Sequence, residues 1–130
     1  MESILVITKS GIMYSGMTIE DRHENDWLGL RPSKKSEVCI FFPKKHIEKI
    51  YHTNGIIESP IVTDAKNSEI SSFSNIALIR LRGGVSYRGE ILENAPDGIS
   101  SSSGFWLMPN LNGELIFNIP ENEVERIFTS

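Results

Sequence analysis

The chain has 130 residues, of which 39% are hydrophobic and 23% charged, so it is expected to fold as one ordinary globular domain or two very small ones. Its one cysteine, Cys39, excludes an intrachain disulfide and fits a reducing, cytoplasmic compartment. No apolar run approaches the ~20 residues needed to cross a bilayer, so no membrane partner is expected.

The net charge of −4 is unevenly distributed along the chain. Residues 1–52 hold eight Lys/Arg and seven Asp/Glu, net +1, whereas residues 53–75 hold one and three, net −2. Residues 76–130 hold four and seven, net −3. The acidic second half argues against broad phosphate binding, so no DNA partner is expected, and it suits a basic protein partner instead.

Short apolar runs separated by turn residues predict five strands in the first 51 residues. Gly11 is expected to supply the first turn, and Gly16 marks a bend or a close backbone approach within the second strand. Lys44–His46 fits a single tight turn after Pro43, which ends the fourth strand because it has no N–H to donate. The predicted strands are Ile4–Ile7, Met13–Glu20, Trp27–Leu30, Val38–Phe42 and Ile47–Tyr51.

Residues 53–75 form a connector that is rich in serine and contains Gly55 and Pro60. Ile56-Ile57 and Ile61-Val62 are candidates for an added strand, and Thr63-Asp64 for the cap of a short helix. Five strands follow it, with a long loop between the second and the third. They are Ile76–Leu81, Tyr87–Leu92, Phe105–Met108, Leu115–Ile119 and Val124–Phe128.

The two sets of strands are copies of one unit. Gly-x-x-Tyr-x-Gly occurs at Gly11–Gly16 and again at Gly84–Gly89, 73 residues later (84 − 11). Pro32–Tyr51 aligns without a gap on Pro109–Phe128, 77 residues later (109 − 32). The predicted fold is therefore all-β, with two tandem five-stranded small barrels packed together. They are expected to comprise residues 1–52 and 76–130.

Alternation in the fourth strand of each unit separates its two faces. One face is apolar in both copies and is predicted to be core. It comprises Val38, Ile40 and Phe42 in the first copy and Leu115, Phe117 and Ile119 in the second. The other face is mixed, so it is predicted to be partly exposed or at an interface. Ile47, Ile50, Val124 and Ile127 are expected to complete the core.

This pattern resembles the Sm-like family of small β-barrels. The likeness is carried by the glycine turn, the bent second strand, and the tight turn into a fifth strand with apolar residues three apart. The resemblance implies assembly through the edges of the fourth and fifth strands, which a tandem pair can imitate within one chain. It also implies RNA binding through a loop with the spacing of Asp21 and Asn25 and through the turn at Lys44, Lys45 and His46.

The residues themselves suggest a competing protein interface. Trp106 aligns with Gly29 rather than with Trp27, so it is the choice for an exposed interface anchor. Asp97, Glu121 and Glu123 carry the negative charge of the second copy. Tyr14 and Tyr87 could stack on bases, but packing beside the bent strand is the preferred interpretation.

No arrangement of residues predicts catalysis, a metal site or a cofactor. The loop from Asp21 to Asp26 holds His23 and carboxylates, but neighbouring residues converge poorly on one ion. Cys39 aligns with Ile116, which favours a packing thiol. The leading hypothesis is a non-enzymatic protein-binding module, for example an acidic inhibitor or immunity-type protein covering a basic partner. The alternatives are an Sm-like RNA-binding protein and a self-associating ring-former.

Overall fold

The computed structural model describes residues 3–19, 26–32, 36–53, 76–99, 104–109 and 113–129. These residues form ten strands and two single 3-10 turns. The first half holds β1 (Ser3–Thr8), β2 (Met13–Thr18), β3 (Trp27–Arg31), β4 (Cys39–Pro43), the turn η2 (Lys44–His46) and β5 (Ile47–Thr53). The second half holds β6 (Ile76–Leu81), β7 (Ser86–Leu92), β8 (Phe105–Met108), β9 (Ile116–Ile119), η3 (Glu121–Glu123) and β10 (Val124–Thr129). The all-β prediction is confirmed, and all ten predicted strands are present.

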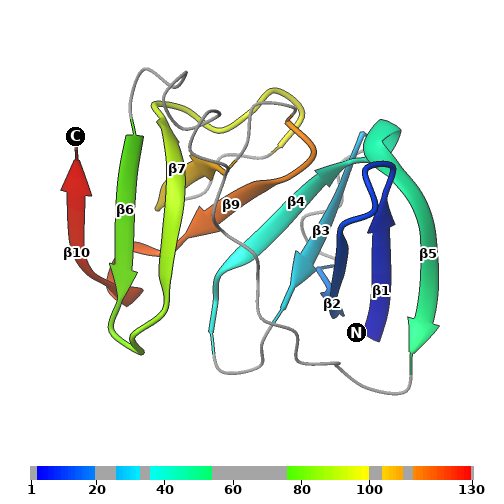
Figure 1. Ribbon diagram of the computed structural model, residues 1–130, viewed down its shortest axis with the longest axis horizontal. Coiled ribbons are helices and arrows are strands. Elements are labelled where there is room, and N and C mark those ends of the chain that lie inside the picture. The colour runs from blue at the N-terminus through cyan, green and yellow to red at the C-terminus, as the bar shows by residue number, and fades with distance from the viewer. Residues whose placement is uncertain are drawn as a thin grey trace.

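The ten strands form one antiparallel sheet in the order β10-β6-β7-β8-β9-β4-β3-β2-β1-β5. Each half has the same internal order, with its fifth strand beside its first and its fourth strand at the centre of the molecule. The sheet is strongly twisted and is not closed, so β5 and β10 lie at opposite ends of the long axis (Figure 1). Two separate closed barrels were expected, whereas strand pairing runs continuously through both halves.

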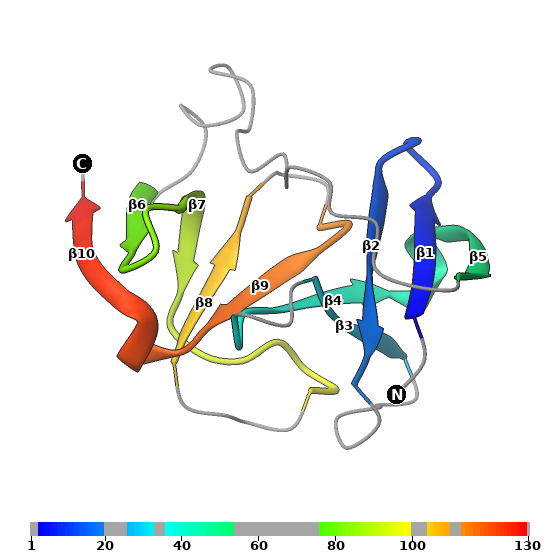
Figure 2. The same ribbon diagram turned by 90° about the horizontal axis from the view of Figure 1, so that it is seen from below.

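The halves meet where β4 pairs with β9, side by side at the centre of Figure 2. Cys39 lies opposite Asn118, Ile40 opposite Phe117, and Phe41 opposite Ile116. Phe117 is also the repeat equivalent of Ile40 (40 + 77), so a local two-fold axis passes through this pair. We call the β4–β9 pairing the seam. The expected internal contact between a fourth and a fifth strand is replaced by a contact between two fourth strands.

The repeated glycines take the positions that the motif predicted. Gly11 and Gly84 both have φ of +92°, a left-handed conformation that suits glycine in the turns before β2 and β7. Gly16 lies where a Cβ would collide with the carbonyl oxygen of Arg31, and Gly89 where it would collide with that of Met108. The bent second strand therefore approaches the third-strand backbone closely in both halves.

One apolar cluster runs along a single face of the sheet and includes residues of both halves. The six residues predicted for the core face of the fourth strands are all in it, each at most 1% exposed. Ile47, Val124 and Ile127 pack against it, as predicted. Ile50 was expected there as well, but it is 45% exposed because β5 is the end strand of the sheet and nothing covers it among the described residues.

A second, smaller cluster covers the opposite face at the seam. It contains Cys39, Phe41, Ile99, Trp106 and Ile116. Ile99 belongs to the loop after β7, and Ala95 of that loop packs against the cluster as well. This loop covers the mixed face of the fourth strands. That face is therefore buried at a contact between the halves and is not exposed to solvent. The connector at residues 54–75 lies outside the described residues, and so do the strand and helix candidates in it.

Candidate protein interface

The acidic turn η3 begins the last segment of the chain and is held by the β6–β7 hairpin. The Arg82 backbone N–H donates to the Glu123 carbonyl (2.9 Å), and the Arg82 Nε donates to the Asn122 carbonyl (3.1 Å). Pro120 precedes the turn in extended conformation, and the Val124 N–H closes it by donating to the Glu121 carbonyl. Glu121 is exposed and Glu123 is half-buried. The turn therefore presents its charge from a fixed backbone.

The two predicted carboxylates of this turn have different environments. Glu123 Oε2 accepts hydrogen bonds from Ser36 Oγ (3.2 Å) and from the Glu37 backbone N–H (3.1 Å), so it ties η3 to the start of β4. Burial, with a smaller contribution from Glu123, raises the pKa of Tyr87 to about 12. The Glu121 side chain, in contrast, is exposed. Its carboxylate is the better candidate for a partner.

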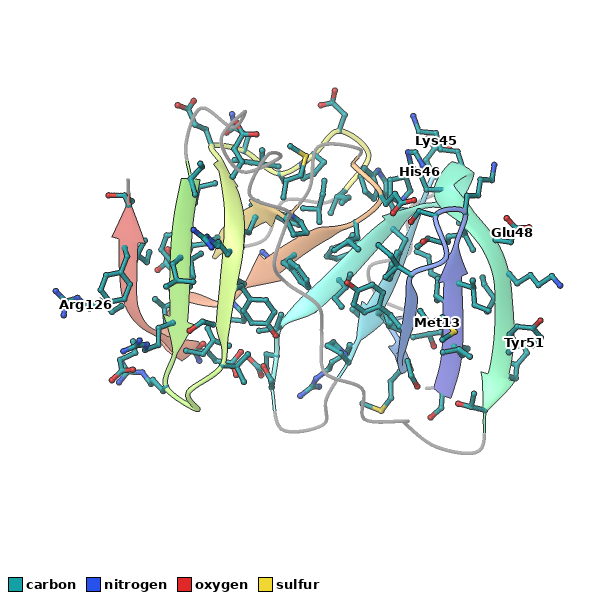
Figure 3. The ribbon with its side chains drawn as sticks, viewed as in Figure 1. Met13, Lys45, His46, Glu48, Tyr51 and Arg126 are labelled. Carbon is teal, nitrogen blue, oxygen red and sulfur yellow. The ribbon has the colours of Figure 1, made fainter. Side chains whose placement is uncertain are left out.

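Beyond η3, β10 runs along an open edge of the sheet and pairs only with β6 among the described strands. Glu125 and Arg126 are exposed, and Figure 3 shows Arg126 projecting away from the molecule. Phe128 is 37% exposed, with the guanidinium carbons of Arg126 and Arg80 at 4.9 and 5.6 Å from its ring centroid. Both distances fit cation–π contacts. We call Glu121–Thr129 the acidic edge.

Phe128 was not among the residues predicted for an interface. It ends the predicted strand Val124–Phe128, aligns with Tyr51, and follows Ile127, which was expected to complete the core. The alternation of β10 did contain the relevant signal, since Ile127 and Phe128 cannot both face the core. An aromatic side chain at an open edge is a typical interface residue.

At the other end of the molecule, η2 and β5 form the equivalent edge with opposite charge. Lys44 and Lys45 are exposed and His46 is half-buried, so the structure brings these three predicted residues together in one turn. The turn is anchored because the Lys44 N–H donates to the Asp26 carbonyl (2.9 Å) and the Lys9 N–H donates to the His46 carbonyl (2.8 Å). Asn25, the fourth predicted RNA-binding residue, lies outside the described residues.

Strand β5 itself is exposed from Glu48 to His52 and pairs only with β1 among the described strands. Two of its large apolar side chains, Ile50 and Tyr51, are 45% and 47% exposed. Lys45, His46, Glu48 and Tyr51 all lie on the outer side of this end of the molecule (Figure 3). We call Lys44–Thr53 the basic edge.

The prediction that Trp106 is an exposed anchor is wrong. Trp106 is 4% exposed, and its ring centroid lies 5.6 Å from that of Phe41 across the seam. The loop after β7 covers this face, so Trp106 anchors the contact between the halves rather than an external one. Asp97 lies in that loop, exposed, and its carbonyl accepts a hydrogen bond from Trp27 Nε1 (3.0 Å). The predicted acidic set is thus divided between this loop and η3.

Tyr14 and Tyr87 are packing residues beside the bent strands, as the sequence predicted. They are 5% and 4% exposed and lie in the large core cluster, with ring contacts to Phe42 at 5.5 Å and to Phe117 at 4.9 Å. Burial, followed by the nearby Glu114 and Tyr87, raises the pKa of Tyr14 to about 12. Both phenols therefore stay protonated at neutral pH. Bases cannot stack on rings that are this deeply buried.

A polar chain also crosses between the halves beside these rings. Glu114, 3% exposed, accepts a hydrogen bond from Ser10 Oγ at 2.5 Å, and Ser10 Oγ lies 3.1 Å from Thr8 Oγ1. Thr8 Oγ1 in turn accepts from the Ile12 N–H (3.1 Å). This chain links the first turn of the protein to the start of β9, so it fixes the relative placement of the halves.

The described residues contain no group of three or more His, Cys, Asp or Glu side chains that could hold a metal. Cys39 is 7% exposed in the seam cluster, and its Sγ donates to the Glu37 carbonyl (3.4 Å), which confirms the packing role. His23 lies outside the described residues. Among the helices of the described part of the chain, none is long and apolar enough to cross a membrane.

Comparisons with protein-family models, with curated proteins and with solved structures found no match to this chain. The resemblance to the Sm-like family therefore stays a hypothesis. The two edges of the sheet and their charges are the features that a partner could recognise.

Proposed function

We propose that this protein is a non-enzymatic, cytoplasmic binding protein whose acidic edge takes a basic protein partner. The observation that carries the proposal is a row of exposed negative charge that runs from the anchored turn η3 into β10, an end strand that pairs only with β6 among the described strands. Glu121 and Glu125 are exposed on that edge, and the exposed ring of Phe128 supplies an apolar contact beside them. Charge complementarity of this kind steers encounter and selects partners, and an aromatic side chain can add affinity.

The recognition mode that fits an edge is strand addition. The outward N–H and C=O groups of β10 have no strand partner among the described residues. A basic segment in extended conformation would pair with them, and Glu121 and Glu125 would contact its Lys or Arg side chains. An inhibitor or immunity-type protein that covers a basic surface is one protein of this kind.

We further propose that each half is an Sm-like unit. The support is the same strand order in both halves, together with the glycine turn, the bent second strand and the single 3-10 turn before the fifth strand. Under this proposal the second unit has lost the basic turn that the family's RNA binding would use, because Glu121 stands in the second unit where Lys44 stands in the first.

Binding to a panel of basic proteins, including nucleases, tests the function. The wild-type protein should bind at least one member at about 10 mM salt, where the Debye length is about 30 Å, and release it near 1 M. The E121K/E125K variant should lose that binding by at least about tenfold, because charge pairs in the contact are reversed.

The matched control is E93K/D97K. It reverses two exposed carboxylates in the loop after β7, outside both edges, and changes the net charge by the same amount, from −4 to 0. Equal losses in the two variants would show that binding depends on net charge alone and would contradict the proposal. Absence of any basic partner at low salt would contradict it as well.

RNA binding by the basic edge is the second candidate, supported by exposed Lys44, Lys45 and Lys49 on the same segment as the exposed ring of Tyr51. Basic side chains with an aromatic platform bind single strands. Titration with uridine-rich and adenosine-rich oligonucleotides at about 50 mM salt tests it, since phosphate contacts are strong there. Lack of binding to either oligonucleotide rejects RNA.

A further inference from the structure

The positive charge of the second half is concentrated on three neighbouring strands. Residues 76–130 hold no lysine, and their four basic residues are Arg80, Arg82, Arg88 and Arg126. Three of these arginines lie on β10, β6 and β7, which are side by side at the left of Figure 1. The net charge of −3 therefore does not describe this part of the surface, which is cationic.

Strand pairing puts the three arginines on one face of the sheet. Arg126 lies directly opposite Arg80. Leu78 lies directly opposite Phe128 on one side and Arg88 on the other. Residues that are opposite each other, or two apart on one strand, share a face, so all five side chains lie together. They are on the face away from the large core cluster, because the alternate residues of β6 are buried in that cluster's direction. We call these five residues the arginine face.

Two of these arginines are held close together around one aromatic ring. The guanidinium carbons of Arg126 and Arg80 lie 4.9 and 5.6 Å from the Phe128 ring centroid. Like charges directly opposite each other on neighbouring strands are unfavourable. Among the described residues, no carboxylate forms an ion pair with any of the three arginines, although Glu90 shares their face. An anion bound between the guanidinium groups would remove their repulsion.

The first half shows that the fold does not require these arginines. Under the 73-residue offset of the glycine motif, Ile7 stands where the second half has Arg80, and Ser15 stands where it has Arg88. The strand pairing around these positions is the same in the two halves. Two of the three guanidinium groups are therefore specific to the second half and are not explained by the needs of the shared fold.

We propose that the arginine face binds a phosphate monoester carried by a protein partner, that is, a phosphorylated side chain. A phosphate monoester has a charge of about −1.5 to −2 near pH 7 and three acceptor oxygens, so one group pairs with two opposed guanidinium groups. A carboxylate neutralises only one of them. Arginine suits phosphate better than lysine does, because its planar fork binds two oxygens at once. Leu78 and Phe128 contact the apolar side chains next to the phosphorylated residue.

The charge around the arginine face favours a single phosphate over a nucleic-acid strand. Glu121 and Glu125 are exposed on the segment that carries Arg126, and the second half is net −3 even with its arginines counted. A strand of phosphates would meet these carboxylates, whereas one phosphorylated side chain would not. The site goes beyond the proposed function. Because Arg80 and Arg88 lie outside the acidic edge, variants at these positions test the site separately.

Titration of the full chain with a short peptide that carries one phosphoserine, followed by NMR, tests the site. The peptide should shift the Nε–H signals of Arg80, Arg88 and Arg126, and its unphosphorylated form should not. Arg80→Gln should weaken binding at least about tenfold, because it removes a charged hydrogen-bond donor. Arg80→Lys should also weaken binding, since the charge remains but the planar fork is lost. Lys9→Gln is the matched control, because it removes one exposed positive charge in the first half and should leave binding unchanged.

Four other results would each overturn the proposed site. They are unshifted arginine signals, equal weakening by Arg80→Gln and Lys9→Gln, equal binding of a peptide with glutamate in place of phosphoserine, and tighter binding of a single-stranded oligonucleotide at the same arginines. Circular dichroism verifies the fold of each variant. If the phosphopeptide binds but no basic protein does, the proposed function fails and this site is retained. If a basic protein binds and E121K/E125K abolishes that binding, but the phosphopeptide does not bind, only this site is rejected.

Discussion

At the scale of single residues, glycine and buried tyrosine explain most of what the repeated motif does. In Gly-x-x-Tyr-x-Gly, the first glycine adopts a positive φ and the last lets two backbones approach closely. The tyrosine between them packs into the shared core. These roles follow from sterics, so both copies of the motif predicted them without knowledge of the assembly.

Substituting Gly16 by alanine should lower the free energy of unfolding by about 1–3 kcal/mol, since the new Cβ would press on the Arg31 carbonyl and the strands would have to separate. Gly89→Ala should do the same in the second half. Urea denaturation measures the effect. Gly83→Ala is the control, because nothing lies within 4 Å of a Cβ there; equal losses at Gly83 and Gly16 would contradict the close-approach explanation.

Alkaline pH should destabilise the protein through Tyr14 and Tyr87. Their folded pKa of about 12 exceeds the ordinary value of 10.0, so between those values the unfolded chain loses these protons before the folded one does. Stability is therefore full below pH 10 and falls as pH rises toward 12, by about 2–3 kcal/mol for each tyrosine. Urea denaturation at pH 8 and 11 measures the fall, of which about half should be present at pH 11. It should be smaller in Tyr14→Phe/Tyr87→Phe; an equal fall in that variant would assign it to other groups.

At the scale of elements, the seam combines a short strand pairing with aromatic packing. Phe41 packs on Gly29 in its own half and on Trp106 in the other. A small residue in one half thus faces a large one in the equivalent place of the other. This asymmetry explains why Trp106 has no aromatic counterpart in the first half and is nevertheless buried.

Trp106→Ala should destabilise the whole protein by about 3–5 kcal/mol, the usual loss for a large buried aromatic residue. Urea denaturation followed by circular dichroism measures the change. Phe41→Ala and the double variant complete a cycle, which should give a coupling of about 0.5–1.5 kcal/mol for the ring pair. Additive effects of the two substitutions would contradict a direct contact across the seam.

At the scale of the whole molecule, the strands were predictable and their assembly was not. Apolar alternation located all ten strands, and the shared core faces of β4 and β9 followed from comparing the two copies. The seam did not follow, because whether a fourth strand meets a fourth or a fifth strand depends on contacts between residues that are far apart in the chain. The exposure of Ile50 and the burial of Trp106 both follow from that choice.

The candidate interface was predictable in part for the same reason. The sequence predicted that the charged residues of η2 and η3 lie in tight turns, because each turn follows a proline and precedes an apolar strand. It could not predict that Glu123 holds η3 in place, because its partners Ser36 and Glu37 lie about 87 residues away in sequence. Phe128 could be identified as an interface residue only from the position of β10 at the end of the sheet.

Two like halves form one sheet through the seam and leave β5 and β10 as its open edges. Residue-resolved amide hydrogen exchange on dilute protein tests this arrangement most directly. Amides of β4 and β9 should exchange among the slowest in the chain, because pairing and both apolar clusters enclose them, whereas outward amides of β5 and β10 should exchange fast. Fast exchange throughout β4 and β9, with protection of β5 and β10, would contradict the account.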